Sequence, residues 1–596
     1  MDNQRNIILA VLLTALVLFG WEAGVSYFYP NRDTPAKRAE IAQKEEAKPS
    51  AEQPKATRDG GLRTPEDIAL EKRDLETALA GGGRVPVKAP GLTGSINLTG
   101  AVIDDLVTPH HRETVKKDSG PVRIFSPSGT PAQHFAQIGW VGGEGLPTAQ
   151  TVFTLASGDA LAPGSPVTLQ WDNGSGQRFA ITYEIDEDYL ITATQTVTNS
   201  GSAPVSVRPF GLINRTDRTA SLDTWNVHSG PIGAFDDSVS FGPDYDEVAE
   251  APQQAIEMEG LAEWTGFTDV YWMSALAPAD LPATGAFRSL GGGIYRADLL
   301  YGQANLPAGQ KLTTKTYLFA GAKEADVLDR YEELGISKFG LSIDWGWFRW
   351  FEKPIFALLL WLFNLFGNFG VAIIALTVII RALIFPIAQK QFASMAQMRA
   401  IQPKMKALQE RYKDDKQKQQ QEIMKLYKDE GVNPLGGCLP IFLQIPIFFA
   451  LYKTLMLAIE MRHEPFILWI KDLSAPDPLH VLNLFGLLPF TPPGFLAIGI
   501  LAVLLGITMW LQFKLNPAQM DPVQQQVFMI MPWVLMFVMA PFAAGLLIYW
   551  ITSNILTIAQ QAYLYSKHPQ LKEQAAKEAA DKQRAAERDK SAKGEA

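Results

Sequence analysis

The stretch FGVAIIALTVIIRALIFP, residues 369–386, decides the fold of this 596-residue chain. Its only charged side chain is that of Arg381. A helix that crosses a bilayer needs about 17–25 predominantly apolar residues, and this run has that length. The stretch therefore predicts a membrane-spanning helix in an α-helical membrane protein.

Arg381 is the unusual residue of this helix, because an ionised guanidinium in hydrocarbon costs several kcal/mol unless it meets water, a partner or headgroups. In one interpretation its long side chain snorkels to the interface. In the other it faces a water-filled cavity, with Thr377 one turn earlier on the same helix face. In that case Arg381 is a cationic binding site inside the membrane. The residues alone leave both interpretations open.

The composition averages a soluble part and a membrane part, with 47% hydrophobic residues and a net charge of −9. The single cysteine, Cys438, cannot form an internal disulfide. No P-loop is evident, and no cysteine follows the first apolar segment as a lipid anchor would require. We expect no nucleotide, no metal and no other cofactor.

The N-terminal half predicts an exported β domain behind an anchor. Residues 7–27 are apolar apart from Glu22 and no clear cleavage site follows, which favours an uncleaved signal anchor. Residues 30–61 are rich in Lys, Glu, Ala and Pro and predict a flexible linker. From about residue 94 to 321 apolar residues alternate with period two, as in FAITYEI at 179–185. Turn signals recur between such runs, a pattern typical of an antiparallel β-sandwich.

Several side chains of this domain are candidate catalytic groups: His110, His111, His134, His228, Asp236 and Asp237. Their spacing dictates no particular chemistry. The domain is therefore interpreted as a binding or scaffold module, and a sugar-modifying enzyme anchored in the membrane is the less favoured alternative.

Charge and hydropathy then divide the whole chain. Lys and Arg outnumber Asp and Glu in residues 388–436, which places this segment in the cytoplasm. Tryptophans interleaved with charges in residues 337–367 predict a helix that lies on the outer surface.

Six spans result, with both termini in the cytoplasm. The predicted segments are 1–29 (signal anchor), 30–61 (linker), 62–336 (exported β-sandwich), 337–367 (interfacial helix), 368–387, 437–459, 495–512, 527–541 and 545–565 (spans two to six), 388–436 (helical hairpin), 460–494 (outer loop), 513–526 (cytoplasmic loop) and 566–596 (cytoplasmic tail).

Two further sets of side chains are site candidates. Gln444 carries an amide in a span where lipid would reject it. The hairpin places Met395, Met398 and Met405 at helical spacing. These methionines either form a soft surface for hydrophobic segments or make an ordinary seam between two helices.

Three motifs resemble the YidC/Oxa/Alb family of membrane protein insertases in its Gram-negative bacterial YidC form. They are NPLGGCLPIFLQIPIFFALY at 433–452, SMAQMRAIQPKMKAL at 394–408 and SNILTIAQQ at 553–561. The resemblance covers about residues 341–565 and implies a five-helix core around a hydrophilic groove, with a periplasmic β-super-sandwich. It places the family's arginine at Arg381 and groove residues at Thr377, Gln444, Tyr549, Ser553, Asn554 and Thr557. At Trp550 the chain departs from the second tyrosine expected in many relatives.

The resemblance implies an insertase of the bacterial inner membrane, which is not an enzyme. Its implied partners are nascent membrane proteins, the lipid bilayer, the Sec translocon and, through the hairpin and tail, the ribosome. The tail is less basic than in members thought to dock ribosomes strongly, and no nucleic-acid site is evident. An anion transporter or channel that uses Arg381 is the alternative, although such folds usually show internal repeats.

Overall fold

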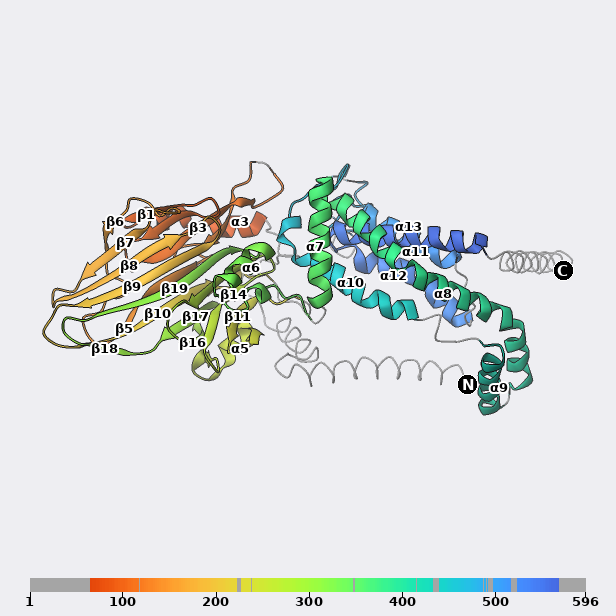
Figure 1. The fold of residues 1–596 in the computed structure, drawn as a ribbon. Coiled ribbons are helices and arrows are strands. Elements are labelled where there is room, and N and C mark those ends of the chain that lie inside the picture. The colour runs from red at the N-terminus through yellow and green to blue at the C-terminus, as the bar shows by residue number, and fades with distance from the viewer. Residues whose placement is uncertain are drawn as a thin grey trace.

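The computed structural model describes residues 65–567, apart from 117, 222–226, 237, 347–348, 414, 432–438, 486, 489, 491, 493–496 and 516–521. The predicted signal anchor, the linker, and the tail from residue 568 onward lie outside the described residues. Figure 1 shows the strands gathered at one end of the molecule and the long helices at the other, with α7 (Arg349–Phe366) between them.

The strands form two antiparallel sheets. One has ten strands in the order β1-β2-β3-β5-β10-β17-β16-β13, with β4 on β3 and β18 on β10; the other has nine in the order β12-β11-β14-β15-β19-β9-β8-β7-β6. Their bounds are β1 Arg84–Lys88, β2 Thr93–Asn97, β3 Val102–Arg112, β4 Pro121–Phe125, β5 His134–Gly142, β6 Thr154–Ser157, β7 Val167–Asp172, β8 Gln177–Ile185, β9 Leu190–Asn199, β10 Val205–Thr216, β11 Gly230–Phe235, β12 Ser238–Phe241, β13 Ala255–Glu257, β14 Ala262–Thr268, β15 Trp272–Pro278, β16 Ala283–Gly291, β17 Ile294–Tyr301, β18 Ala304–Leu306 and β19 Lys311–Ala322.

The alternation read from the sequence produces these sheets. In β8 the side chains of Phe179, Ile181 and Tyr183 are fully buried, while Arg178 and Glu184 on the opposite face are exposed. Successive side chains of a strand point to opposite faces, so every second residue reaches the core. The predicted antiparallel β-sandwich is confirmed.

Short helices complete this domain: α3 Pro65–Lys72, α4 Leu75–Ala80, α5 Tyr245–Glu250, α6 Ala325–Glu333, and the 3-10 turns η2 Asp217–Thr219, η3 Pro252–Gln254 and η4 Phe339–Ser342. Helix α6 buries Val327, Leu328 and Tyr331. The Tyr331 hydroxyl also donates a hydrogen bond of 2.6 Å to Asp186. These contacts hold α6 against the sheets at the point where the chain leaves the β domain.

The helical part consists of α7 followed by α8 Phe369–Arg411, α9 Lys416–Asp429, α10 Leu439–Leu457, η6 Ile459–Met461, α11 Ile500–Leu515, α12 Pro522–Met539 and α13 Ala544–Lys567. Within the described ranges, Phe369–Gln389 of α8 is the one helical stretch that is long and apolar enough to cross a bilayer. Counted over residues whose side chains are described, shorter apolar helical stretches occupy Pro446–Leu457, Ile500–Lys514 and Met529–Met539. The count of six spans therefore stays a prediction.

The helix ends differ from those predicted at three places. Helix α8 continues without a break from the apolar run into the predicted hairpin, because the intervening Gln, Lys, Met and Ala residues favour helix. Helix α11 begins at Ile500, five residues later than predicted, because Gly499 pairs with His480 as in a strand. Helix α12 begins at Pro522 instead of residue 527, and proline fits the first turn of a helix.

Candidate functional site

Arg381 lies in α8 and faces α13. Its Nη2 donates a hydrogen bond to the hydroxyl of Ser553, a side chain that is 3% exposed. Arg381 itself is half-buried. Two residues separated by 172 positions in the chain thus meet at this contact between helices.

The two helices are aligned by close packing near their first turns. Asn368 caps α8, because its side chain accepts a 3.0 Å hydrogen bond from the backbone N–H of Val371. A Cβ on Gly545 would stand 3.2 Å from the carbonyl oxygen of Leu473 and 3.4 Å from Ile373 of α8, so glycine allows this approach. Arg381 lies eight residues beyond Ile373 in α8, and Ser553 lies eight residues beyond Gly545 in α13. Parallel helices with equal rise per residue keep that alignment and bring the two side chains together.

The other polar residues predicted on these helices point to different partners. The hydroxyl of Thr377 is buried and donates to the carbonyl oxygen of Ile373 in its own helix, at 2.6 Å. Thr557 likewise donates to the carbonyl oxygen of Ser553, at 2.8 Å. Asn554 is buried and donates to Thr508 of α11, at 3.2 Å. Among the predicted residues whose side chains are described, Ser553 is therefore the one that forms a side-chain hydrogen bond with Arg381.

Aromatic residues continue the same stretch of α13. Tyr549 is buried one turn before Ser553. The Trp550 ring lies 5.3 Å from the ring of Phe448, measured between centroids, and so joins α13 to α10. Gln444 lies in α10 one turn before Phe448, and its side chain is outside the description. The backbone thus brings α8, α10, α11 and α13 around this region.

No ion pair joins Arg381 to an Asp or Glu within the part of the chain that the structure describes. Its side-chain hydrogen-bond partner there is the neutral Ser553 hydroxyl, and Tyr549 is near enough to interact with its charge. A hydroxyl accepts a hydrogen bond but does not neutralise a guanidinium. Arg381 therefore keeps a full positive charge that an acidic group from another molecule could pair with.

Two participants were missed by sequence reasoning. Thr508 of α11 accepts the hydrogen bond from Asn554, and the Gln560 side chain of α13 lies 3.5 Å from the carbonyl oxygen of Arg381. Polar residues on predicted spans were the signal that would have found both, since such residues seldom face lipid.

The hairpin methionines are placed less completely. Met395 and Met398 lie in α8, and their side chains are outside the description. Met405 is half-buried, and its sulfur accepts a 3.2 Å hydrogen bond from the hydroxyl of Tyr427 in α9. Met405 thus lies in the seam between α8 and α9.

The histidines considered as catalytic groups are dispersed over the β domain. His111 contacts Glu324 at 3.0 Å, His134 contacts Ser274 at 2.8 Å, and His228 contacts the carbonyl oxygen of Pro231 at 2.8 Å. Asp236 accepts a hydrogen bond from the Leu261 N–H, and Asp237 falls on an undescribed residue. No group of three His, Cys, Asp or Glu residues suited to a metal occurs among the described residues.

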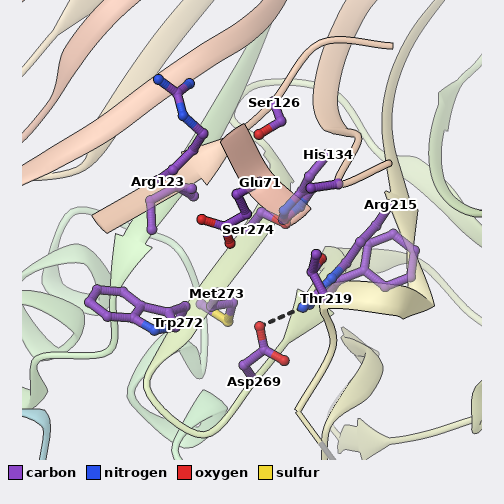
Figure 2. Close-up of a pocket in the computed structure, with 13 residues that line it drawn as sticks. Glu71, Arg123, Ser126, His134, Arg215, Thr219, Asp269, Trp272, Met273 and Ser274 are labelled. Atoms are coloured by element: carbon purple, nitrogen blue, oxygen red, sulfur yellow. Dashed lines mark hydrogen bonds and ion pairs between the residues drawn. The ribbon is translucent and has the colours of Figure 1, made fainter. Parts of the chain in front are cut away.

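A polar pocket lies between strands of this domain (Figure 2). Its lining residues are Glu71, Arg123, Ile124, Ser126, Ala132, His134, Arg215, Thr219, Phe267, Asp269, Trp272, Met273 and Ser274. Figure 2 marks the ion pair between Arg215 and Asp269, whose nitrogen and oxygen are 2.5 Å apart. This paired arginine contributes to the fold and carries no free charge.

Comparisons with known proteins cover nearly the whole chain. Residues 84–358 match the family described as YidC periplasmic domain, and residues 361–573 match the family described as 60Kd inner membrane protein. A protein of Zymomonas mobilis named membrane protein insertase YidC is 44% identical, over 95% of this chain and 96% of its own length. A protein of the same name from Paracoccus denitrificans is 42% identical, over 95% of both chains. A crystal structure titled as an active YidC insertase, with its first transmembrane domain resolved, is 18% identical with a TM-score of 0.33, over 84% of this chain and 97% of that one.

Proposed function

Because the chain belongs to the YidC family of membrane protein insertases, which acts in the inner membrane and carries a periplasmic domain, we propose that Arg381 is the centre of its client-binding groove. Membrane protein insertion, and not catalysis, is the activity of this chain, so nascent membrane proteins are its substrates. The proposal concerns which residues receive the client. The observation that carries it is a guanidinium that contacts a hydroxyl and no carboxylate within the described residues.

The groove lowers the barrier that a client's polar tail meets. Each unpaired polar group costs several kcal/mol in hydrocarbon. A hydrated, positively charged site part of the way across shortens the dry path. An acidic group on the tail is attracted to Arg381, and the attraction is stronger where the local dielectric is low.

The client's own apolar segment supplies the driving force. Burial of apolar surface contributes about 25 cal/mol per Å². Burial of a segment of spanning length therefore releases far more free energy than the attraction between the client's tail and Arg381. The segment then moves into lipid between neighbouring helices. This route needs no nucleotide and no metal.

The remaining predicted residues receive the client along the same surface. In the proposed groove Ser553 orients the Arg381 side chain, and Tyr549, Trp550 and Gln444 continue the wall toward α10. Thr377, Asn554 and Thr557 keep helices α8, α11 and α13 in position through their own hydrogen bonds. Met395 and Met398 meet the client first, at the cytoplasmic hairpin.

The arrangement in the membrane is part of the proposal. Six spans place both termini and the hairpin in the cytoplasm, the β domain in the periplasm, and α7 flat on the outer surface. The Sec translocon is the proposed partner within the membrane, and the ribosome is the proposed partner on the cytoplasmic side. Insertion of some clients proceeds through this chain alone.

Site-specific photocrosslinking tests the groove. A photoreactive amino acid replaces Ser553 or, as a matched control on the same helix, Ile555, which is 53% exposed. A ribosome-bound client with an acidic translocated tail should crosslink from position 553 and much less from position 555. Equal crosslinking from both positions would contradict a groove on the Arg381 side of α13.

A further inference from the structure

The loop between α10 and α11 carries an apolar surface that the proposed groove does not use. We call residues 479–490 the apolar finger; its backbone is described except at Gly486 and Pro489. The finger exposes these large side chains: Val481 41%, Leu482 47%, Leu484 52%, Phe485 49%, Leu487 81%, Leu488 41% and Phe490 46%. Clustered exposure of this kind in one loop marks an interaction surface.

The charge pattern around the finger is as unusual as its exposure. No Asp, Glu, Lys or Arg occurs between Asp477 and Lys514. Loops that face water normally carry charged side chains, and the one titratable side chain in this interval is that of His480. An acidic or basic protein partner would find no complementary charge here. The chemistry suits a neutral apolar environment.

The base of the finger is attached to the helical part by one buried carboxylate. Asp477 is 1% exposed; its Oδ1 accepts hydrogen bonds from the Leu479 N–H and the Trp469 indole, both at 3.0 Å. Its Oδ2 accepts a 2.8 Å bond from the N–H of Leu501, in the first turn of α11. The finger therefore starts at the level where α11 starts.

Further contacts hold the rest of the loop at the same level. The Val481 N–H donates to the carbonyl oxygen of Ile498 at 2.9 Å, and the Asn368 side chain, which caps α8, donates to the carbonyl oxygen of Phe466 at 3.1 Å. The loop is thus bonded to the first turns of α8 and α11. Figure 1 shows these turns at the end of the helices that faces the β domain.

Exposed apolar side chains also lie on the helices that face lipid or the interface in the proposed topology. Leu504 and Ile507 of α11 are 40% and 43% exposed, and Trp350 and Trp361 of α7 are 74% and 58% exposed. Tryptophan concentrates at the membrane interface. The finger lies in the chain directly before the lipid-facing part of α11, so acyl chains are the neutral apolar environment within its reach.

We propose that the apolar finger penetrates the outer leaflet of the membrane and contacts lipid acyl chains. This inference rests on the proposed topology, which places the loop on the periplasmic side, and is independent of the role of Arg381. Because the finger has no Asp, Glu, Lys or Arg, its insertion depends on apolar burial and not on anionic headgroups. The finger thereby anchors the outer ends of α11 and α8 at a fixed depth.

Depth-dependent fluorescence quenching tests the proposal in the full-length protein, reconstituted in vesicles of phosphatidylethanolamine and phosphatidylglycerol. Cys438→Ser supplies a cysteine-free chain, and Leu487→Cys then carries an environment-sensitive dye. Leu334→Cys is the matched control, because Leu334 is 55% exposed and lies at the end of α6 in the β domain. Lipids with a spin label on the acyl chain should quench the dye at position 487 and leave the dye at 334 unchanged.

Other outcomes contradict the proposal. The finger faces water if the acyl-chain spin label quenches the dye at position 487 no more than the dye at 334. The same conclusion follows if a water-soluble quencher acts on the 487 dye as strongly as on the 334 dye. Efficient disulfide formation between two undyed Leu487→Cys chains means that a second copy covers the finger. Neither result bears on Arg381, whose role is read from client crosslinking.

A second variant separates apolar burial from headgroup binding. Leu484→Asp should abolish acyl-chain quenching of a dye at position 487, whereas omission of phosphatidylglycerol from the vesicles should leave that quenching unchanged. Loss of quenching on omission of the anionic lipid, with no effect of Leu484→Asp, would overturn the inference.

Discussion

Two arginines withdrawn from water, Arg215 in the β domain and Arg381 in the helical part, show how the two regions use the same side chain. Arg215 is 3% exposed and pairs with Asp269, which also accepts hydrogen bonds from the Ser221 N–H at 2.8 Å and the Ser229 hydroxyl at 3.0 Å. Burial alone would lower the pKa of Arg215, but Asp269, Tyr245 and Asp217 together outweigh burial and hold this pKa above its ordinary value.

Arg381 has no such carboxylate among the described residues, and its side chain contacts the Ser553 hydroxyl. The β domain satisfies its arginine internally, because a buried unpaired charge would destabilise the sandwich. Among the described residues of the helical part, no carboxylate compensates the charge of Arg381. In our proposal the client supplies the missing negative charge during insertion.

The largest effect is expected from reversal of the charge at Arg381. Arg381→Glu should reduce insertion of clients with an acidic translocated tail by about tenfold or more, and Arg381→Ala should also impair it, because both remove the attraction. Arg381→Lys should retain most activity, since the role is a positive charge and not bidentate geometry. Insertion into inverted membrane vesicles, measured by protease protection, is the assay. Equal insertion of acidic-tailed clients by wild type and the Glu variant would remove Arg381 from the mechanism.

A large effect on stability is expected from removal of the carboxylate that pairs with Arg215. Asp269→Ala leaves Arg215 buried without its carboxylate and should destabilise the β domain by about 3–5 kcal/mol. Thermal unfolding of the purified protein measures the change. Asp172→Ala is the matched control, because the Arg178–Asp172 pair is more than half exposed on both sides and should change stability little. Similar destabilisation by the two variants would show that the buried pair is not special.

In the proposed mechanism a client must cross part of the membrane to reach Arg381, whereas Arg215 lies in the β domain. Lengthening α12 is therefore expected to have a moderate effect on insertion. The apolar run predicted as this span, Val527 to Ala540, reaches about 21 Å at about 1.5 Å per residue, against a hydrocarbon core of about 30 Å. Helix α12 begins earlier, at Pro522, but residues 524–526 are glutamines, so the apolar run stays short and supports local thinning. One turn of leucines inserted after Val538 should slow insertion roughly threefold to tenfold. Insertion at the wild-type rate by a normally folded variant would exclude thinning at α12.

A smaller, pH-dependent effect is expected where the two regions touch. The Glu460 side chain accepts a 3.4 Å hydrogen bond from the Ala325 N–H of α6; burial, with Glu324 and Asp326 nearby, raises its pKa to about 7. Because this pKa is higher in the folded state, protonation of Glu460 stabilises the contact below the unfolded pKa of about 4.3. The stabilisation is lost as pH rises through about 7.

Thermal unfolding between pH 5 and pH 8 tests this linkage. The wild-type midpoint should fall with rising pH, and the midpoint of Glu460→Gln should fall less. Glu333→Gln, an exposed glutamate of α6, is the control and should keep the wild-type slope. A Glu460→Gln profile that is parallel to wild type would assign the pH dependence to other groups.

The least effect on insertion is expected from deletion of most of the β domain, residues 63–321. Arg462 donates to the carbonyl oxygen of Arg112 at 2.8 Å and lies 5.4 Å from the Trp272 ring centre, so the deletion removes these contacts. Arg462 then becomes solvated and is not left buried, which avoids a large penalty. Simple clients should insert at nearly the wild-type level. Complete loss in a variant that is stably present in the membrane would contradict this prediction.

Local patterns in the sequence were sufficient for much of the fold. Alternation in β8 and similar runs predicted the antiparallel sandwich, because side-chain direction in a strand depends only on the neighbouring residues. The apolar run at 369–386 predicted the spanning stretch of α8, and its one charge identified Arg381 as a candidate. Motif resemblance predicted the family, which the comparisons then established.

Only the tertiary structure decided which groups meet. Arg381 contacts Ser553 across 172 residues, Asn554 turns to Thr508 of α11, and Arg215 finds Asp269 across 54 residues. No periodic pattern encodes such pairs, because they depend on how the helices and sheets pack and not on local conformation. The start of α11 was likewise decided by a distant contact, the bonds of Asp477 and the pairing of His480 with Gly499. Sequence therefore determined the elements and the unusual charge, whereas packing determined that Arg215 meets a carboxylate and that Arg381 meets none among the described residues.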